Sequence, residues 1–262
     1  MTCRNTQFYR LYLMLPLIFI ASTGCSNDLL DLDFRQEMVN FVSEISDYAK
    51  AVDSTFLVFP QNASELSSIS GYLDAVDGIG QEDIYYGYDG DGQKTPADVT
   101  AELEDNLKSF TDAGKLVLTV DYPFNDPEIP AFTSEIIPRI NDTYARSSEN
   151  GFVPYCAVRE LSHMTVNPGY EPEVNNYPLA LDSVTDFIYI LQHQESITRS
   201  QFLDSLSRLG FDLIVMDYED EGGPYTPEEI AELKQESKAI LLAYMSIGEA
   251  ENYRFYWEED WG

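Results

Sequence analysis

The sequence predicts an α/β protein built on a parallel sheet that helices cover on both faces. Three observations carry this prediction. Seven short apolar runs recur along the 262 residues, segments with helical periodicity lie between most of them, and polar or charged residues stand just after several runs. Near-continuous apolar strands that alternate with helices are typical of sheets buried on both faces.

The first 24 residues have the composition of an export signal. Two arginines, Arg4 and Arg10, precede a short apolar run, and small residues precede Cys25. This order defines a secretory signal, and the run is too short to span a membrane. It resembles the signal of bacterial lipoproteins, which implies a lipid on Cys25, and an ordinary cleaved signal is the alternative. Residues 25–33 then form an acidic tether, and residues 34–262 form the domain.

A lipid on Cys25 would give a membrane anchor and an exported protein, held at the outer membrane or the cell surface. The acidic residues that follow Cys25 resemble the leader of surface-displayed lipoproteins. Without the lipid, the protein would be periplasmic or secreted.

Charge excludes one class of partner. The chain has 46 acidic and 15 basic residues and a net charge of −31. Such a surface repels phosphate backbones and anionic membranes, so no nucleic-acid partner is predicted. Only Cys156 remains beyond the lipidated cysteine, and there are two histidines, so neither a disulfide nor a zinc site of the usual kind is predicted.

Helical periodicity is clearest in five segments, in which apolar residues recur at intervals of three and four. Gly114 is a natural stop for the second of them. Thr226 starts the last, because a threonine N-cap is followed by proline and two acids. The segments are 34–48, 103–110, 136–145, 199–209 and the one that begins at Thr226.

The apolar runs between these helices are the predicted strands, and a loop over 162–179 separates the fourth run from the fifth. In chain order the strands are 56–59, 73–79, 116–120, 152–158, 187–191, 211–216 and 239–246.

Polar residues stand just beyond the carboxyl ends of these strands. In a (β/α)8 TIM barrel that rim carries the chemistry. A doubly wound open sheet would give a similar pattern, but its glycine-rich phosphate loop is absent. Seven strands are one fewer than a closed barrel needs, so the sequence predicts an incomplete TIM-barrel type. The rim residues are Gln61, Asn62, Glu82, Asp121, Arg159, Asp217 and Glu249.

Seven stretches of the chain resemble the glycoside hydrolase family 114-type TIM-barrel proteins, the endo-α-1,4-polygalactosaminidases. The resemblance covers nearly the whole mature chain and implies a barrel fold and a glycosidase activity. The stretches are RQEMVNFVSEISDYAK, FLVFPQNASEL, LDAVDGIGQEDIYYG, GKLVLTVDY, GFVPYCAVREL, GFDLIVMDYEDEGGPYTPEEI and LLAYMSIGEAENYRFYW.

Two departures from the family pattern matter. The order of the segments is reversed, as in a circular permutation, and an aspartate-bearing segment of the form GFDGVYLD has no counterpart. In the permuted order this segment would follow Trp261. We therefore expect strands 56–59 and 239–246 to flank the place of an eighth strand, each with an unpaired edge.

Glycosidases need two carboxylates across the scissile bond. The resemblance places a catalytic glutamate at Glu82 and its partner on the absent segment. Within this chain Asp217, Asp121 and Glu249 are the other candidates at the rim. A solvated loop acid is the alternative for Glu82, and a helix cap or an ion pair with Arg159 or Arg254 is the alternative for the others.

Further residues are predicted to contact a sugar, the tyrosines by stacking on its face, although core packing explains any one tyrosine equally well. The predicted substrate-binding residues are Gln61, Asn62, Tyr85, Tyr122, Arg159, Tyr218, Tyr253 and Arg254.

The sequence thus predicts a glycoside hydrolase acting on an α-1,4-linked, galactosamine-containing polysaccharide by a two-carboxylate mechanism, impaired by the absent strand. No organic cofactor is suggested, and the chemistry requires no metal. The alternative is a non-catalytic surface lipoprotein that binds glycans.

Overall fold

The computed structural model describes residues 32–174, 179–194, 196–247 and 257–258. The chain divides into two compact units, Met1–Phe34 and Arg35–Gly262. Of the first unit only residues 32–34 are described, and they lead into the first helix. All features below belong to the second unit.

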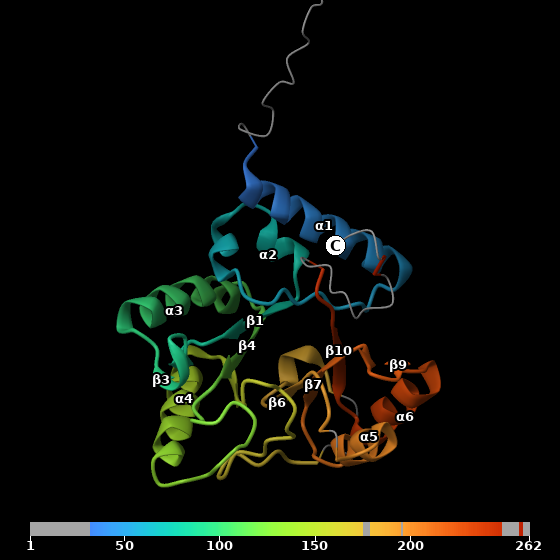
Figure 1. Cartoon of the computed structure of the whole chain (residues 1–262). Coiled ribbons are helices and arrows are strands. Elements are labelled where there is room, and N and C mark those ends of the chain that lie inside the picture. The colour runs from blue at the N-terminus through green and yellow to red at the C-terminus, as the bar shows by residue number, and fades with distance from the viewer. Residues whose placement is uncertain (1–31, 175–178, 195, 248–256, 259–262) are drawn as a thin grey trace, which may run out of the picture. The chain divides into compact units, whose positions relative to one another are not determined.

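The described residues include six α-helices, ten strands and two short 3-10 helices, Ser64–Ser68 and Leu181–Ser183. Figure 1 shows how the main elements are arranged. The helices are α1 (Phe34–Val52), α2 (Tyr72–Ala75), α3 (Ala97–Asp112), α4 (Ile136–Asn150), α5 (Arg199–Ser207) and α6 (Pro227–Ser237). The strands are β1 (Gly78–Glu82), β2 (Tyr86–Gly87), β3 (Gly90–Lys94), β4 (Leu116–Asp121), β5 (Val153–Cys156), β6 (Phe187–Ile190), β7 (Leu213–Asp217), β8 (Glu219–Asp220), β9 (Gly223–Pro224) and β10 (Ile240–Tyr244).

Two three-stranded sheets, both parallel, hold the long strands in the orders β1–β4–β5 and β10–β7–β6. Helices connect successive strands of each sheet, and Figure 1 shows α3 and α4 beside the first sheet and α5 and α6 beside the second. The prediction of a mixed α/β protein with parallel strands is confirmed. Among the described residues, the two sheets do not join into a closed barrel.

The first predicted strand, 56–59, lies beside β1 without forming a regular strand. Gln61 makes an isolated parallel bridge to Gly80, in which Gly80 N donates to Pro60 O (2.9 Å) and Asn62 N donates to Gly80 O (2.7 Å). Glycine is required nearby at Gly78, because a Cβ there would lie 2.4 Å from the carbonyl oxygen of Leu116 and 2.1 Å from the ring of Phe59. Residues 57–61 therefore extend the first sheet by one edge segment.

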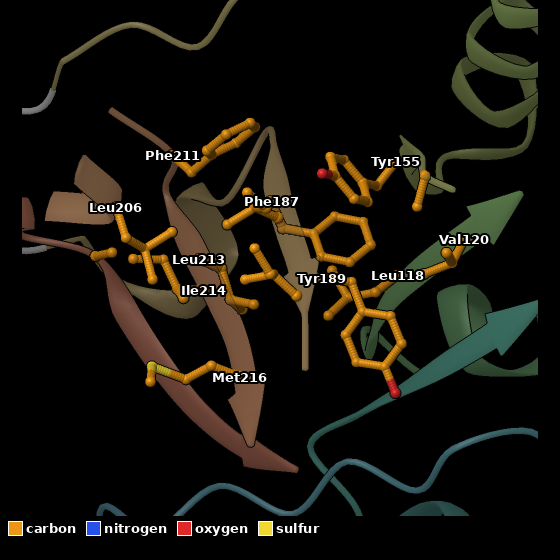
Figure 2. Close-up of a cluster of buried hydrophobic side chains, with 14 of the residues drawn as sticks. Leu118, Val120, Tyr155, Phe187, Tyr189, Leu206, Phe211, Leu213, Ile214 and Met216 are labelled. Carbon is orange, nitrogen blue, oxygen red and sulfur yellow. The ribbon is translucent and has the colours of Figure 1, made fainter. Parts of the chain in front are cut away.

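The main hydrophobic core lies between the two sheets. Figure 2 shows Leu118 and Val120 of β4 on one side and Phe187 and Tyr189 of β6 on the other. The residues between them point outward. Thr119, between Leu118 and Val120, is an example, because its hydroxyl lies 3.3 Å from that of Ser147 on the covering helix α4. Successive side chains of a strand point to opposite faces. The sheets therefore share one interior, and the helices cover the outside.

The predicted start of the second strand was wrong. Residues 72–75 form α2, and β1 begins only at Gly78. The ring of Tyr72 packs edge-on against Phe110 of α3, with 6.1 Å between ring centroids, which favours a helical turn there. Gly78 and Gly80 lower the apolar character of β1, so the sequence predicted only a weak strand there. Its last residue is Glu82, which the sequence assigned to the following loop.

The N-cap predicted at Thr226 is confirmed and is open to test. The Thr226 side chain accepts from Glu229 N, and the Glu229 side chain accepts from Thr226 N, which completes a capping box. We expect Thr226→Ala to lower the free energy of unfolding by about 1 kcal/mol, because a backbone donor loses its partner. Thr226→Ser keeps the hydroxyl and is the matched control. Urea unfolding measures both, and equal losses in the two variants would contradict this role.

Candidate functional site

A cavity of about 720 Å³ lies inside the two sheets. It is lined by inward residues of five strands, among them Gly80, Val120, Tyr189, Val215 and Tyr244. Side chains alternate along a strand. The inward residues at the carboxyl ends are therefore Glu82, Tyr122, Tyr189, Asp217 and Tyr244, which we call the inner rim.

The Glu82 carboxylate is held on both oxygens. Tyr122 Oη donates to Glu82 Oε1, and Asn62 Nδ2 donates to Oε2 (3.1 Å). Asn62 Oδ1 accepts in turn from Glu82 N (3.0 Å) and from Gln81 Nε2 (3.0 Å). Asn62 adopts a φ of 61°, a conformation that asparagine tolerates better than most residues. Asn62 and Tyr122 thus fix the orientation of the carboxylate.

The side chain of Arg159 packs against the ring of Tyr122. Its guanidinium carbon lies 3.7 Å from the centroid of the Tyr122 ring. The same group donates to Asp83 (3.0 Å), Asp91 (2.8 Å) and the carbonyl of Gly87 (2.8 Å). Burial first, and then the charge of Glu82, raise the pKa of Tyr122 well above its ordinary value, so the phenol remains a donor. Arg159 therefore positions Tyr122 and ties the β2–β3 hairpin to the rim.

Tyr189 of β6 stands at the rim of the second sheet. Its ring packs against that of Tyr244 at 6.3 Å between centroids. Burial raises the pKa of Tyr189, and the nearby charges of Glu82, Tyr244 and Asp217 raise it further. Asp217 Oδ1 accepts from Glu219 N (3.1 Å), which orients its carboxylate. One phenol is thus within electrostatic reach of Glu82 from the first sheet and of Asp217 from the second.

Sequence reasoning missed Tyr189. The run FIYI reads as a buried core strand, and its neighbours Phe187 and Ile188 are indeed almost fully buried. The alternation of side chains along a strand was the signal that could have found it. Tyr189 stands two residues after Phe187 at the end of a strand, where an inward side chain reaches the rim.

Asp121 lies on the other face of β4. Its Oδ1 accepts from Tyr85 N (2.6 Å) and Tyr86 N (2.8 Å), and its buried Oδ2 has no partner in the described part of the chain. Burial is the main cause that raises its pKa to about 7, against the lowering effect of the two backbone donors. The structure thus places Asp121 under the turn that follows Glu82, outside the cavity.

The other predicted residues are placed as follows. Tyr85 is buried on the helix side, with the Arg146 guanidinium 4.3 Å from its ring centroid, so it does not reach the cavity. Gln61 lines the cavity. Tyr218 Oη donates to Glu219 (3.1 Å) beside Asp217. Glu249, Tyr253 and Arg254 lie outside the described residues, as does Cys25.

In the described ranges, no group of three or more histidine, cysteine, aspartate or glutamate side chains is arranged to hold a metal ion. No helix of this part of the chain has the length and apolar character needed to cross a membrane.

Comparison with known proteins gives relatives without a described activity. No family model matches the chain. An uncharacterized protein of Methanocaldococcus jannaschii is 34% identical over 141 residues, and one of Deinococcus radiodurans is 32% identical over 133 residues. Each match covers 51% of this chain and 39% of the relative. An uncharacterized protein of Thermotoga maritima is 37% identical over 79 residues, 29% of this chain and 22% of the relative. The chain therefore spans about two fifths of the first two relatives.

The buried Asp121 predicts a specific pH dependence of stability. The folded protein holds a proton that the unfolded chain releases near its ordinary pKa of 3.8. Stability from this group is full below about pH 4 and is lost as the pH rises to about 7. The side chain of Asp121→Asn cannot ionise. We therefore expect the free energy of unfolding of this variant, relative to wild type, to rise by up to roughly 4 kcal/mol between pH 4 and pH 7.

Urea unfolding at pH 4 to 8 measures this difference. Asp105→Asn on the exposed face of α3 is the matched control, and its difference from wild type should stay flat. A flat difference for Asp121→Asn as well would show that Asp121 is ionised in the folded protein throughout.

Proposed function

We propose that this protein is a glycoside hydrolase in which Glu82 and Asp217 form the catalytic pair. The single observation that carries the proposal is their common position at the inner rim, where both charges act on Tyr189. Hydrolysis of a glycosidic bond needs two carboxyl groups, one on each side of that bond.

The two sheets, in this proposal, are parts of one (β/α)8-type barrel. They share a hydrophobic core and one cavity, and β5 of the first sheet lies beside β6 of the second. With residues 57–61 as the first member, the order around the cavity is then 57–61, β1, β4, β5, β6, β7 and β10. The catalytic rim lies at the carboxyl ends of these strands, as in enzymes of that fold.

The hydrogen bonds at Glu82 support its role in this proposal. Glu82 accepts hydrogen bonds on both oxygens, which suits the carboxylate that attacks the anomeric carbon or activates water. Asp217 supplies the second carboxyl group of the pair. Tyr244 is only partly buried and presents its ring at the same rim, where a sugar face can stack.

The substrate class is an α-1,4-linked polysaccharide that contains galactosamine. The resemblance to polygalactosaminidases motivates this choice, and the net charge of −31 suits a polymer with free, protonated amines. A lipid on Cys25 would hold the enzyme at the outer membrane or cell surface, where such a polymer is met.

A glycan-binding protein without catalysis is the second candidate. One observation favours it. In the described part of the chain, the rim is interrupted between Tyr244 and Gln61, where β10 and residues 57–61 make no ladder with each other. An open rim can hold a sugar chain without enclosing the scissile bond.

Hydrolysis of partly deacetylated α-1,4-galactosaminan, measured as new reducing ends, tests the proposal. We expect Glu82→Gln and Asp217→Asn each to lower the rate by about 100-fold or more, because each removes a proton-transfer or nucleophilic group. The exposed residues Glu102 and Asp105 of α3 offer matched controls, since Glu102→Gln and Asp105→Asn should leave the rate unchanged.

Binding of the same polymer is measured beside turnover. Full activity in Glu82→Gln would remove Glu82 from the mechanism. Saturable binding by the wild type without any release of reducing ends would favour the glycan-binding protein.

A further inference from the structure

Each strand that carries a candidate carboxylate leads into a short antiparallel hairpin. After Glu82 at the end of β1, strands β2 and β3 form one hairpin. After Asp217 at the end of β7, strands β8 and β9 form the other. An arginine from a neighbouring connection binds each of them, Arg159 after β5 and Arg199 at the start of α5. The second of these arginines belongs to a cluster of buried and charged side chains beside Asp217.

Arg199 joins α5 to the β8–β9 hairpin. Its Nε donates to Asp220 Oδ2 (2.7 Å), and its Nη2 donates to Asp220 Oδ1 and to the carbonyl of Gly223 (2.5 Å). The guanidinium carbon lies 4.8 Å from the centroid of the Tyr225 ring, and Nη1 lies 3.6 Å from a carboxylate oxygen of Glu229. A bidentate pair of this kind fixes geometry as well as charge. We call the Arg199–Asp220 pair the hairpin clamp.

The Asp220 carboxylate is held on both of its oxygens. Its side chain is only 7% exposed, and Oδ1 also accepts from Gly222 N (2.7 Å). On the other side, His193 Nε2 lies 3.4 Å from Oδ2. The hydrogen bonds from Arg199 are the main cause that lowers the pKa of Asp220 below its ordinary value, so this carboxylate stays ionised. The hairpin clamp is therefore a charged contact with little freedom on the hairpin side.

The needs of helix α5 do not explain an arginine at this place. Arg199 is the first residue of α5 and follows the N-cap Thr198, whose capping box with Gln201 fixes the start of the helix. The N-terminus of a helix carries a partial positive charge, which disfavours a cation there. The contacts with the hairpin offset this unfavourable position. The capped helix start gives the guanidinium a fixed point in the fold.

The hairpin clamp lies next to the backbone donor that orients Asp217. Glu219 N, at the start of β8, donates to Asp217 Oδ1 (3.1 Å), and Asp220 is the next residue of the same strand. Tyr225 N donates to Tyr218 O (3.1 Å), which closes the base of the hairpin directly after Asp217. A shift of the hairpin would therefore move the donor to the Asp217 carboxylate.

The same set of contacts surrounds the other candidate carboxylate. Arg159 donates to Asp91 of β3 and to the carbonyl of Gly87 of β2. It also packs against the ring of Tyr122, the donor to Glu82. In both places one guanidinium binds a hairpin carboxylate, a hairpin carbonyl and a tyrosine ring. Lysine cannot replace arginine in such a set, because it lacks the planar fork of donors.

We propose that Arg199 is a positioning residue, which fixes the Asp217 carboxylate through Asp220 and the β8–β9 hairpin. The inference rests on the proposed function, in which Asp217 belongs to the catalytic pair. Arg199 acts through the backbone donor of Glu219 and not on the substrate. Loss of the hairpin clamp therefore slows the reaction of bound substrate and leaves substrate binding unchanged.

Amide hydrogen exchange of the full chain, measured by NMR, tests this coupling without any substrate. The readout is the amide of Glu219, which donates to Asp217. In Arg199→Ala we expect this amide to exchange at least about 10-fold faster, because the hairpin opens more readily. Asp217→Ala removes the acceptor and gives the rate of the unbonded amide. Arg208→Ala is the matched control, since Arg208 just after α5 is 71% exposed and pairs with Asp204, and its exchange at Glu219 should equal that of wild type.

Added guanidinium separates a specific clamp from a general loss of structure. Guanidinium chloride at about 20 mM, far below the molar concentrations that unfold proteins, should restore slow exchange in Arg199→Ala, because the free cation can bind Asp220. Sodium chloride or urea at the same concentration should have no effect. Asp220→Asn should raise the exchange rate as Arg199→Ala does, and the double variant should add nothing further and show no rescue. Arg199→Lys takes the place of Arg199→Ala if the latter does not fold, and it should still exchange faster than wild type.

Hydrolysis of partly deacetylated α-1,4-galactosaminan gives the catalytic readout. We expect Arg199→Ala to lower kcat by about 10-fold or more and to leave KM within about twofold of wild type, because orientation is lost and binding is not. Guanidinium chloride should restore kcat in parallel with slow exchange at Glu219. A merely structural role would lower the amount of folded enzyme, which thermal unfolding measures, and would give no such parallel rescue.

Two results would overturn the proposal. The first is equal exchange at Glu219 in Arg199→Ala and wild type, which would show that the clamp does not hold the donor to Asp217. The second is faster exchange with an unchanged kcat, or with a change in KM alone, which would leave Arg199 a structural residue. Absence of hydrolysis by the wild type would refute the proposed function instead, and exchange at Glu219 would still decide whether Arg199 holds the Asp217 carboxylate.

Discussion

The structure depends on one constraint, the alternation of side chains and of peptide groups from one residue to the next along a parallel strand. Successive side chains point to opposite faces, and successive peptide groups point to opposite neighbours. This rule turns Glu82 and Asp217 to the same side of their strands as Gly80 and Val215, which line the cavity, and sends Asp121 to the outside. It also decides that Leu241 and Ala243 turn their backbone groups away from β7. The candidate site and the direction of these backbone groups are two consequences of the same geometry.

The end of β4 shows how one strand serves both faces. Asp121 points outward and accepts the backbone donors of Tyr85 and Tyr86, which holds the turn after Glu82 in place. The next residue, Tyr122, points inward and donates to Glu82 itself, with Arg159 against its ring. A buried carboxyl with one unpaired oxygen costs free energy unless it is protonated. Asp121 holds the turn that follows Glu82, and the rigidity that this gives to the rim offsets that cost.

The sequence predicted the helices and the parallel class well, because caps and apolar periodicity are local signals. Thr226 is an example, and its capping box depends on residues three apart. The start of β1 could not be predicted, since Gly78 and Gly80 carry no side chain and are explained by the close approach of residues 57–61 and, at Gly78, of the Leu116 carbonyl. Tyr189 was missed because a continuous apolar run does not reveal which of its side chains point to the interior of the folded protein and reach the rim. The expectation that residues 56–59 and β10 would flank a gap agrees with the cavity between them.

Amide hydrogen exchange along β10 and residues 57–61 of the protein tests the alternation most directly. If the geometry is right, the amides of Leu242 and Tyr244 exchange slowly because they bond to β7, whereas those of Leu241 and Ala243 exchange fast. The amides of Leu57, Phe59 and Gln61 should also exchange fast. Uniform protection along β10 would contradict the account, because both edges of the strand would then be paired.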